Sequence, residues 1–83
     1  MNNDKPTSYD IEIFNQIIND KIKQDGRNGI LNEESLKIAK WMVEQAKKKS
    51  ARDLMMMNVQ LPKIFEANQD KPLKECLDLK IYL

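Results

Sequence analysis

The sequence predicts a mainly α protein, a small single-domain helical bundle built on an antiparallel helical hairpin. Two stretches, at about residues 8–25 and 32–49, space their apolar side chains by three or four residues, which is the spacing of one face of a helix. A short segment with two glycines separates them, and a connection of this length favours antiparallel helices. We therefore expect a flexible lead-in at 1–7 and one domain over 8–83.

The first helix of the hairpin is expected to begin at Thr7 or Ser8, whose hydroxyls can cap a helix N-terminus. Its apolar residues follow at intervals of three and four and draw one narrow stripe. The stripe consists of Ile11, Phe14, Ile18 and Ile22, with Ile17 beside it.

The second helix has matching signals at both ends. Asn32 is a good N-cap, Glu33 and Glu34 suit the positive end of the helix dipole, and the lysines at 47–49 suit the negative end. One face carries Leu36, Ala39, Met42, Val43 and Ala46. Leu31 and Leu36 have the spacing of a hydrophobic staple, and Trp41 widens the apolar arc enough for two neighbouring surfaces. This helix is therefore predicted to be the centre of the core.

Shorter segments are expected after residue 49, where the apolar spacing breaks. Ser50 and Asp53 can open a third short helix, and a continuous bent helix is the alternative. Residues 58–61 are interpreted as a connector or a very short strand. Pro62 suits the first turn of a fourth segment.

The C-terminal residues 77–83 alternate between apolar and polar side chains, which is the pattern of a strand. Such a strand needs a partner, so we expect it to pair with residues 57–61 or to extend a sheet in another subunit or another protein. The alternative is that residues 72–80 form a last helix with a frayed end.

Composition places the chain among intracellular globular proteins. Hydrophobic residues make up 41% of it and charged residues 33%, and no apolar run is long enough to cross a membrane. The N-terminus lacks the features of a secretory signal, and the lone Cys76 excludes an internal disulfide, so a reducing, cytoplasmic setting is expected. With twelve lysines against two arginines, the composition resembles that of small phage accessory proteins, which points to a bacterial or phage-infected cell.

Enzyme chemistry is not expected, and neither a cofactor nor a metal ion is predicted. The sequence contains no histidine, the commonest general base and transition-metal ligand. Residues 23–34 resemble a calcium loop only superficially, because the correct register would place Lys23 and Arg27 at ligand positions. Without a histidine to activate it, Cys76 is interpreted as a structural thiol.

The preferred functional hypothesis is a small non-enzymatic regulatory or interaction protein that binds another protein, with a homo-oligomer as one form of this. The three consecutive methionines 55–57 cannot all face one core from one helix, so at least one should be exposed, where a flexible thioether can adapt to a partner. The candidate contact residues are Trp41, Met55, Met56, Met57, Leu79, Ile81 and Leu83.

The alternative hypothesis is a DNA-binding transcriptional regulator of the helix-turn-helix type over residues 47–68. Residues 37–63 carry seven basic and two acidic side chains, and clustered basic residues can contact phosphates. The turn would lie at Asn58 and Val59, with 61–68 as the recognition helix. The candidate nucleic-acid contacts are Lys47, Lys48, Lys49, Arg52 and Lys63.

Overall fold

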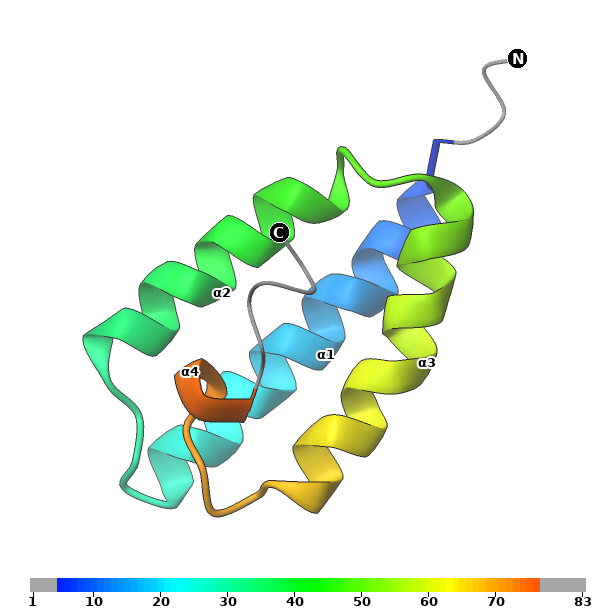
Figure 1. Ribbon diagram of the computed structural model, residues 1–83. Coiled ribbons are helices and arrows are strands. Elements are labelled where there is room, and N and C mark those ends of the chain that lie inside the picture. The colour runs from blue at the N-terminus through cyan, green and yellow to red at the C-terminus, as the bar shows by residue number, and fades with distance from the viewer. Residues whose placement is uncertain (1–4, 77–83) are drawn as a thin grey trace.

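Figure 1 shows a computed structural model, which describes residues 5–76 and confirms the mainly α fold. No strand occurs within residues 5–76. The predicted strand at 77–83 lies outside the described residues. The described helices are α1 (Ser8–Arg27), α2 (Glu33–Ala46), α3 (Ala51–Ala67) and α4 (Leu73–Cys76).

Helix α1 is the centre of the fold, and the prediction that the second helix would hold this place is wrong. In Figure 1, α2 and α3 flank α1, which contacts all the other described helices, whereas α2 and α3 contact each other only slightly. The reason is that α1 has a wider packing arc than its narrow apolar stripe suggests. Ile18 and Ile22 face α2, while Ile17 and Lys21 lie on the side of α3.

Each long helix begins at a polar side chain that caps it. Thr7 accepts a hydrogen bond from the Asp10 amide at 3.2 Å, and Asn32 accepts one from the Ser35 amide at 2.7 Å. These caps satisfy amides that have no partner inside the helix. The predicted starts of both hairpin helices are confirmed.

The hairpin turn depends on a backbone position that suits glycine. Gly29 has a φ of 73°, in the left-handed region that glycine adopts without a steric penalty. The amides of Ile30 and Leu31 both donate to the Asp25 carbonyl, at 2.9 and 3.2 Å. The chain thereby reverses direction at the end of α1, as the hairpin requires.

Helix α2 ends at Ala46, three residues earlier than predicted. The next helix determines this boundary, because Ser50 adopts an extended conformation and accepts a hydrogen bond from the Asp53 amide at 3.1 Å to cap α3. A residue cannot cap a new helix and continue the old one. The lysines at 47–49 therefore lie in the connection between two helices.

Helix α3 is continuous across residues 51–67, which corrects three predictions. Residues 58–61 are neither a connector nor a strand, so residues 57–61 cannot pair with the C-terminus while their backbone groups bond within a helix. Pro62 lies inside the helix and does not begin a new one. The predicted start of this helix at Ser50 and Asp53 is confirmed, and the alternative of one bent helix that continues from the second helix through residue 50 is wrong. Burial of Leu54, Met57, Leu61 and Phe65 along one side of α3 outweighs the cost of an internal proline.

The core lies where α2, α3 and α4 meet α1. Phe14 and Leu54 are completely buried, and so is Leu73 from the short helix α4. Leu36, predicted to lie on the apolar face of this helix, is 42% exposed, because that side of α2 borders an open groove. The other buried apolar residues are Ile18, Ala39, Met42, Ala46, Met57, Leu61 and Phe65.

Candidate interaction surfaces

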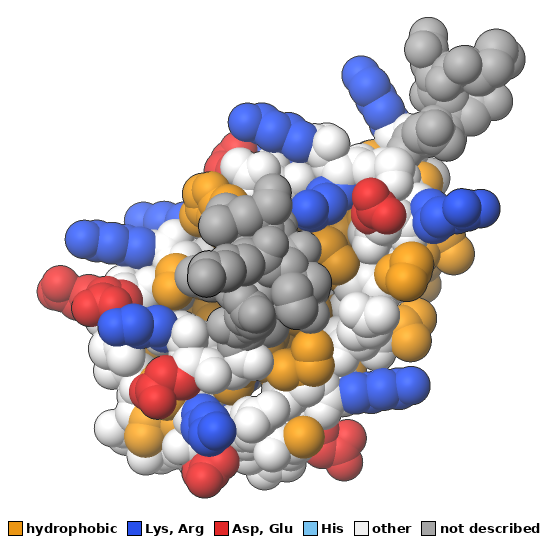
Figure 2. Space-filling model, viewed as in Figure 1, with side chains coloured by type: hydrophobic (Ala, Val, Ile, Leu, Met, Phe, Trp, Pro, Cys, Tyr) orange, Lys and Arg blue, Asp and Glu red, His pale blue; other side chains and the backbone are white. Residues whose placement is uncertain are grey.

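The outer side of α3 presents large apolar side chains to solvent. Met55, Met56 and Val59 are 57%, 52% and 59% exposed. Spacings of three and four residues place them together on the side of the helix opposite Leu54 and Leu61. Figure 2 shows hydrophobic side chains gathered along the edge of the molecule that α3 forms. We call this surface the α3 outer face; its residues are Arg52, Met55, Met56, Val59, Pro62, Lys63 and Glu66, all exposed.

The three consecutive methionines 55–57 lie on different sides of α3, as their spacing requires. Met57 is 8% exposed and belongs to the core, whereas Met55 and Met56 project outward. Consecutive helical residues are rotated by about 100°, so three in a row cannot share one face. The prediction that at least one methionine would be exposed is confirmed. Met57 itself is buried and does not lie on the surface proposed for contact.

Charged side chains stand at both ends of the α3 outer face. Arg52 lies in the first turn of α3, and Lys63 and Glu66 lie in its last two turns. Within residues 5–76, neither Arg52 nor Glu66 has an ion-pair partner. Their charges are therefore available to a molecule that covers this face.

A second apolar surface is the groove between α1 and α2, with a volume of about 520 Å³. Ile18 and Ile22 form one wall, and Leu36 and Val43 form the other. Asn19, Lys40 and Glu44 also line it. The groove can hold an apolar side chain, but its charged residues give no preference for one class of ligand.

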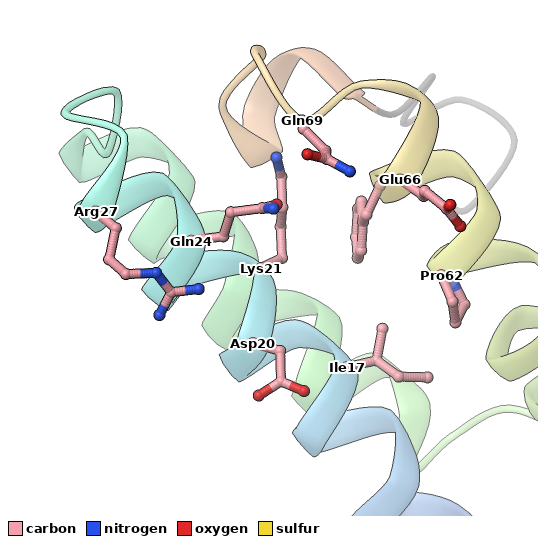
Figure 3. A pocket seen from close by; sticks show the side chains of 9 residues that line it. Ile17, Asp20, Lys21, Gln24, Arg27, Pro62, Glu66 and Gln69 are labelled. Atoms are coloured by element: carbon pink, nitrogen blue, oxygen red, sulfur yellow. The ribbon is translucent and has the colours of Figure 1, made fainter.

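A polar pocket of about 440 Å³ separates α1 from α3 (Figure 3). Figure 3 shows Lys21 reaching from α1 toward the segment between α3 and α4, while Asp20 and Arg27 point away from it. Ile17 and Pro62 face each other at the other end. The Lys21 side chain lines the pocket, and only 2% of this residue is exposed.

The polar contacts of Lys21 are all made within the protein. Its ammonium lies 2.8 Å from Oδ1 of Asp25 and donates to the Lys71 carbonyl at 2.7 Å and the Asn68 carbonyl at 3.4 Å. Two of the three ammonium hydrogens are thus used by backbone carbonyls, and the Asp25 carboxylate offsets the positive charge. The group also lies 5.8 Å from the centre of the Phe65 ring. The pocket is therefore built on a structural ion pair and is not a preformed anion site.

The same ion pair holds α4 in place. Oδ2 of Asp25 accepts a hydrogen bond from the Leu73 amide at 2.8 Å, and the buried Ser35 hydroxyl accepts one from the Lys74 amide at 3.2 Å. These two amides lie at the start of α4 and lack partners within the helix. Side chains of α1 and α2 thus cap α4.

Two ionisable side chains near α4 have shifted pKa values. Glu34 pairs with Lys74, and the hydrogen bond and charge of that ammonium lower the pKa of the carboxyl group. Partial burial raises the pKa of the Cys76 thiol. The thiol lies 3.4 Å from the Lys71 carbonyl. A raised pKa lowers the thiolate fraction of Cys76 at neutral pH, and the interpretation of this residue as a structural thiol stays a prediction.

Four of the five predicted nucleic-acid contacts lie within residues 47–52, and Lys63 lies near the other end of α3. Lys47 and Lys48 are exposed in the connection after α2, and Lys47 pairs with Glu44 at 3.7 Å. The Lys49 residue is partly buried and is engaged in an interaction of its own within the protein. Arg52 and Lys63 lie on α3. The predicted turn at 58–59 is absent because one helix spans it, so these residues do not flank a recognition helix.

The remaining predicted contact residues do not add to the α3 outer face. Trp41 is partly buried and packs against the core from α2. Leu79, Ile81 and Leu83 lie outside the described residues. Among residues 5–76, no cluster of three or more Cys, Asp or Glu side chains could hold a metal ion, and no helix is long and apolar enough to cross a membrane.

Sequence reasoning missed the buried pair of Lys21 and Asp25, although the sequence contains a signal for it. Lys21 follows Ile18 by three residues, and Asp25 follows Lys21 by four, so both fall on the stripe that begins with Ile11 and Phe14. Two opposite charges that lie four residues apart on an apolar stripe indicate an ion pair that is buried together with the apolar side chains. The carbonyls of the α3–α4 segment that satisfy Lys21 could not be predicted in this way.

No protein-family model, curated protein or solved structure matches this chain.

Proposed function

We propose that this protein is a non-enzymatic interaction protein that binds another protein through the α3 outer face. The observation that carries the proposal is the exposure of Met55, Met56 and Val59, each more than half open to solvent on one side of one helix. Exposed apolar side chains gathered on one surface are typical of binding sites, whereas single ones are ordinary.

The chemistry of the surface favours a protein over a nucleic acid. Methionine and valine offer no hydrogen bonds to base edges or phosphates, but methionine packs well against irregular apolar surfaces. Nucleic-acid binding also loses its principal argument, because the helix-turn-helix expected at 47–68 is replaced by the continuous helix α3.

Site-specific photocrosslinking in cells that naturally produce the protein tests this proposal. A diazirine amino acid at Met56 should form a covalent adduct with a protein, and the adduct should survive nuclease treatment. The matched control is the same amino acid at Lys37, which is exposed on α2 and outside the face. Equal adducts from both positions, or none from position 56, would contradict the proposal.

A substitution experiment complements the crosslinking. Replacing Met55 and Met56 with Gln keeps two good helix formers while removing the apolar contact. We expect the adduct from a probe at Val59 to be lost. The control, Leu36→Gln, changes a similarly exposed apolar residue in the α1–α2 groove and should leave that adduct unchanged.

A further inference from the structure

We propose that the partner on the α3 outer face is a second copy of this chain, whose α3 packs antiparallel to the first about a two-fold axis at Val59. The inference rests on the proposed function, because it needs this face to be a contact surface. It adds the identity of the partner and the register of the contact.

The spacing of the charges on α3 carries the argument. Arg52 lies seven residues before Val59, and Glu66 lies seven residues after it. Seven residues make nearly two helical turns, so these three side chains lie along one line on the surface, about 10 Å apart. In an antiparallel pair centred on Val59, Arg52 of each copy therefore faces Glu66 of the other copy, and two symmetric ion pairs form.

The side chains between these pairs also complement one another. Met55 comes opposite Pro62 of the second copy, and Met56 comes opposite Lys63. A lysine can lay its apolar stem against a methionine while its ammonium stays in water. Val59 meets Val59 of the second copy on the axis itself. The face is thus self-complementary, with apolar contacts inside and opposite charges at both ends.

Other registers of the same two helices are disfavoured by charge. Moving the axis to between Met57 and Asn58 places Arg52 opposite Lys63, which are both basic. A parallel pair places Arg52 beside Arg52 of the second copy. Like charges that face each other oppose association and so select against these registers. The chain as a whole carries a net charge of only +1, so two copies do not repel each other strongly at long range.

The size of the surface predicts a weak dimer. Residues 52–66 span about 21 Å of helix, which places the contact at the low end of specific protein interfaces. We expect a dissociation constant on the order of 100 µM, so the dimer should form in a concentration-dependent manner. Sedimentation equilibrium from about 10 µM to 1 mM covers this range.

Charge reversal tests the register. Arg52→Glu alone places Glu opposite Glu66 at both ends, and Glu66→Arg alone places Arg opposite Arg52, so each variant should self-associate about tenfold more weakly than the unmodified protein. An equimolar mixture of the two variants restores opposite charges at both ends. We therefore expect the mixture to form a heterodimer with close to the original affinity.

Lys37→Glu is the matched control, because it makes the same change in net charge as Arg52→Glu on an exposed part of α2. It should leave self-association unchanged. All these positions are exposed, and circular dichroism should show the same unfolding midpoint for each variant within a few degrees.

A disulfide probe locates the two-fold axis. In a Cys76→Ser background, Val59→Cys should give a covalent dimer under mild oxidation, because the two copies of residue 59 meet on the axis. Met56→Cys is the control and should not crosslink, since the two copies of residue 56 lie six residues apart along the pair, or about 9 Å.

The outcomes separate this inference from the proposed function. Recovery of association on mixing supports the second copy in this register. A protein that stays monomeric at 1 mM, or two variants whose mixture associates no better than either alone, overturns the inference. In that case an adduct between a probe at Met56 and a different protein would still support the proposed function.

Discussion

The ammonium of Lys21 lies 2.8 Å from Oδ1 of Asp25, one turn further along α1, and both side chains are closed off from solvent. Through Asp25 and the carbonyls of Asn68 and Lys71, the pair connects α1 to the segment that leads into α4. A buried pair of this kind adds little net stability compared with apolar residues in its place. Removing only one partner is strongly destabilising, because the other charge is then left without compensation.

The first prediction concerns this pair. Lys21→Met and Asp25→Asn should each lower the free energy of unfolding by about 3–5 kcal/mol, because each leaves one charge buried. The double variant should lose clearly less than the sum of the two, since neither charge remains and the new amide can still accept from the Leu73 N–H. Urea unfolding followed by circular dichroism measures all three values.

The exposed pair between Lys47 and Glu44 provides the control for this measurement. Its charged atoms are 3.7 Å apart and both side chains are more than half exposed. Lys47→Met should therefore change the free energy of unfolding by less than about 0.5 kcal/mol. Additive losses at Lys21 and Asp25 would show that the two side chains do not act as a pair.

The second prediction contrasts two apolar residues of the hairpin. Phe14 is completely buried, so Phe14→Ala should lower the free energy of unfolding by about 3–5 kcal/mol. Leu36 is 42% exposed, so Leu36→Ala should cost less than about 1 kcal/mol. Urea unfolding of both variants checks the contrast. Equal losses would place Leu36 in the core, as the periodicity of the sequence predicts.

The hairpin was predictable because local signals agree along it. Asn32 and the two glutamates that follow it mark the start of α2, and the stripe that includes Phe14 and Ile18 marks the face of α1 that is buried. These signals act over three or four residues, so one sequence is enough to read them.

The role of α1 and the continuity of α3 were not predictable in the same way. Both depend on tertiary contacts. α3 passes through Pro62 because Leu61 and Phe65, on either side of it, are buried in the core. A local rule assigns such a proline to the start of a helix, and only the packing overrides it.

For the candidate site, the sequence predicted the exposed methionines but not which ones. To assign Met55 and Met56 to the surface and Met57 to the core, one must know which side of α3 is buried. The connector expected at 58–61 separated the methionines from the buried residues that define this side. The charges at the ends of the face were visible in the sequence. Their common alignment with Val59 became apparent only once the helix was known to be continuous.

The third prediction is a pH dependence at the contact between α2 and α4. The Lys74 ammonium lowers the pKa of Glu34, so the folded pKa lies below the unfolded one. The stabilisation is therefore present at neutral pH and is lost as the pH falls through the folded pKa. NMR titration of the Glu34 carboxyl group should give a midpoint below that of an ordinary glutamate.

Two changes should move this midpoint upward. Lys74→Met removes the hydrogen bond and the charge, and high salt screens the exposed pair, so both should return the pKa of Glu34 toward its ordinary value. If neither change moves the titration midpoint of Glu34, this residue does not pair with Lys74 in solution.

The last prediction distinguishes one helix from two in the region of Pro62. In a continuous α3, the proline has no N–H to donate to the Asn58 carbonyl, so Pro62→Ala should restore that hydrogen bond. An internal proline costs about 3 kcal/mol relative to alanine, and the stiffer unfolded chain that it provides offsets up to about 1 kcal/mol of this. We therefore expect a gain of about 2–3 kcal/mol in the free energy of unfolding. If a helix instead began at Pro62, the proline would occupy a favourable position and its replacement would be neutral or destabilising.

Pro72→Ala is the control, because Pro72 directly precedes α4 and its loss should lower stability by up to about 1 kcal/mol. Urea unfolding at a concentration well below 100 µM gives both values for the monomer, and the sign of the change at Pro62 decides between the two arrangements.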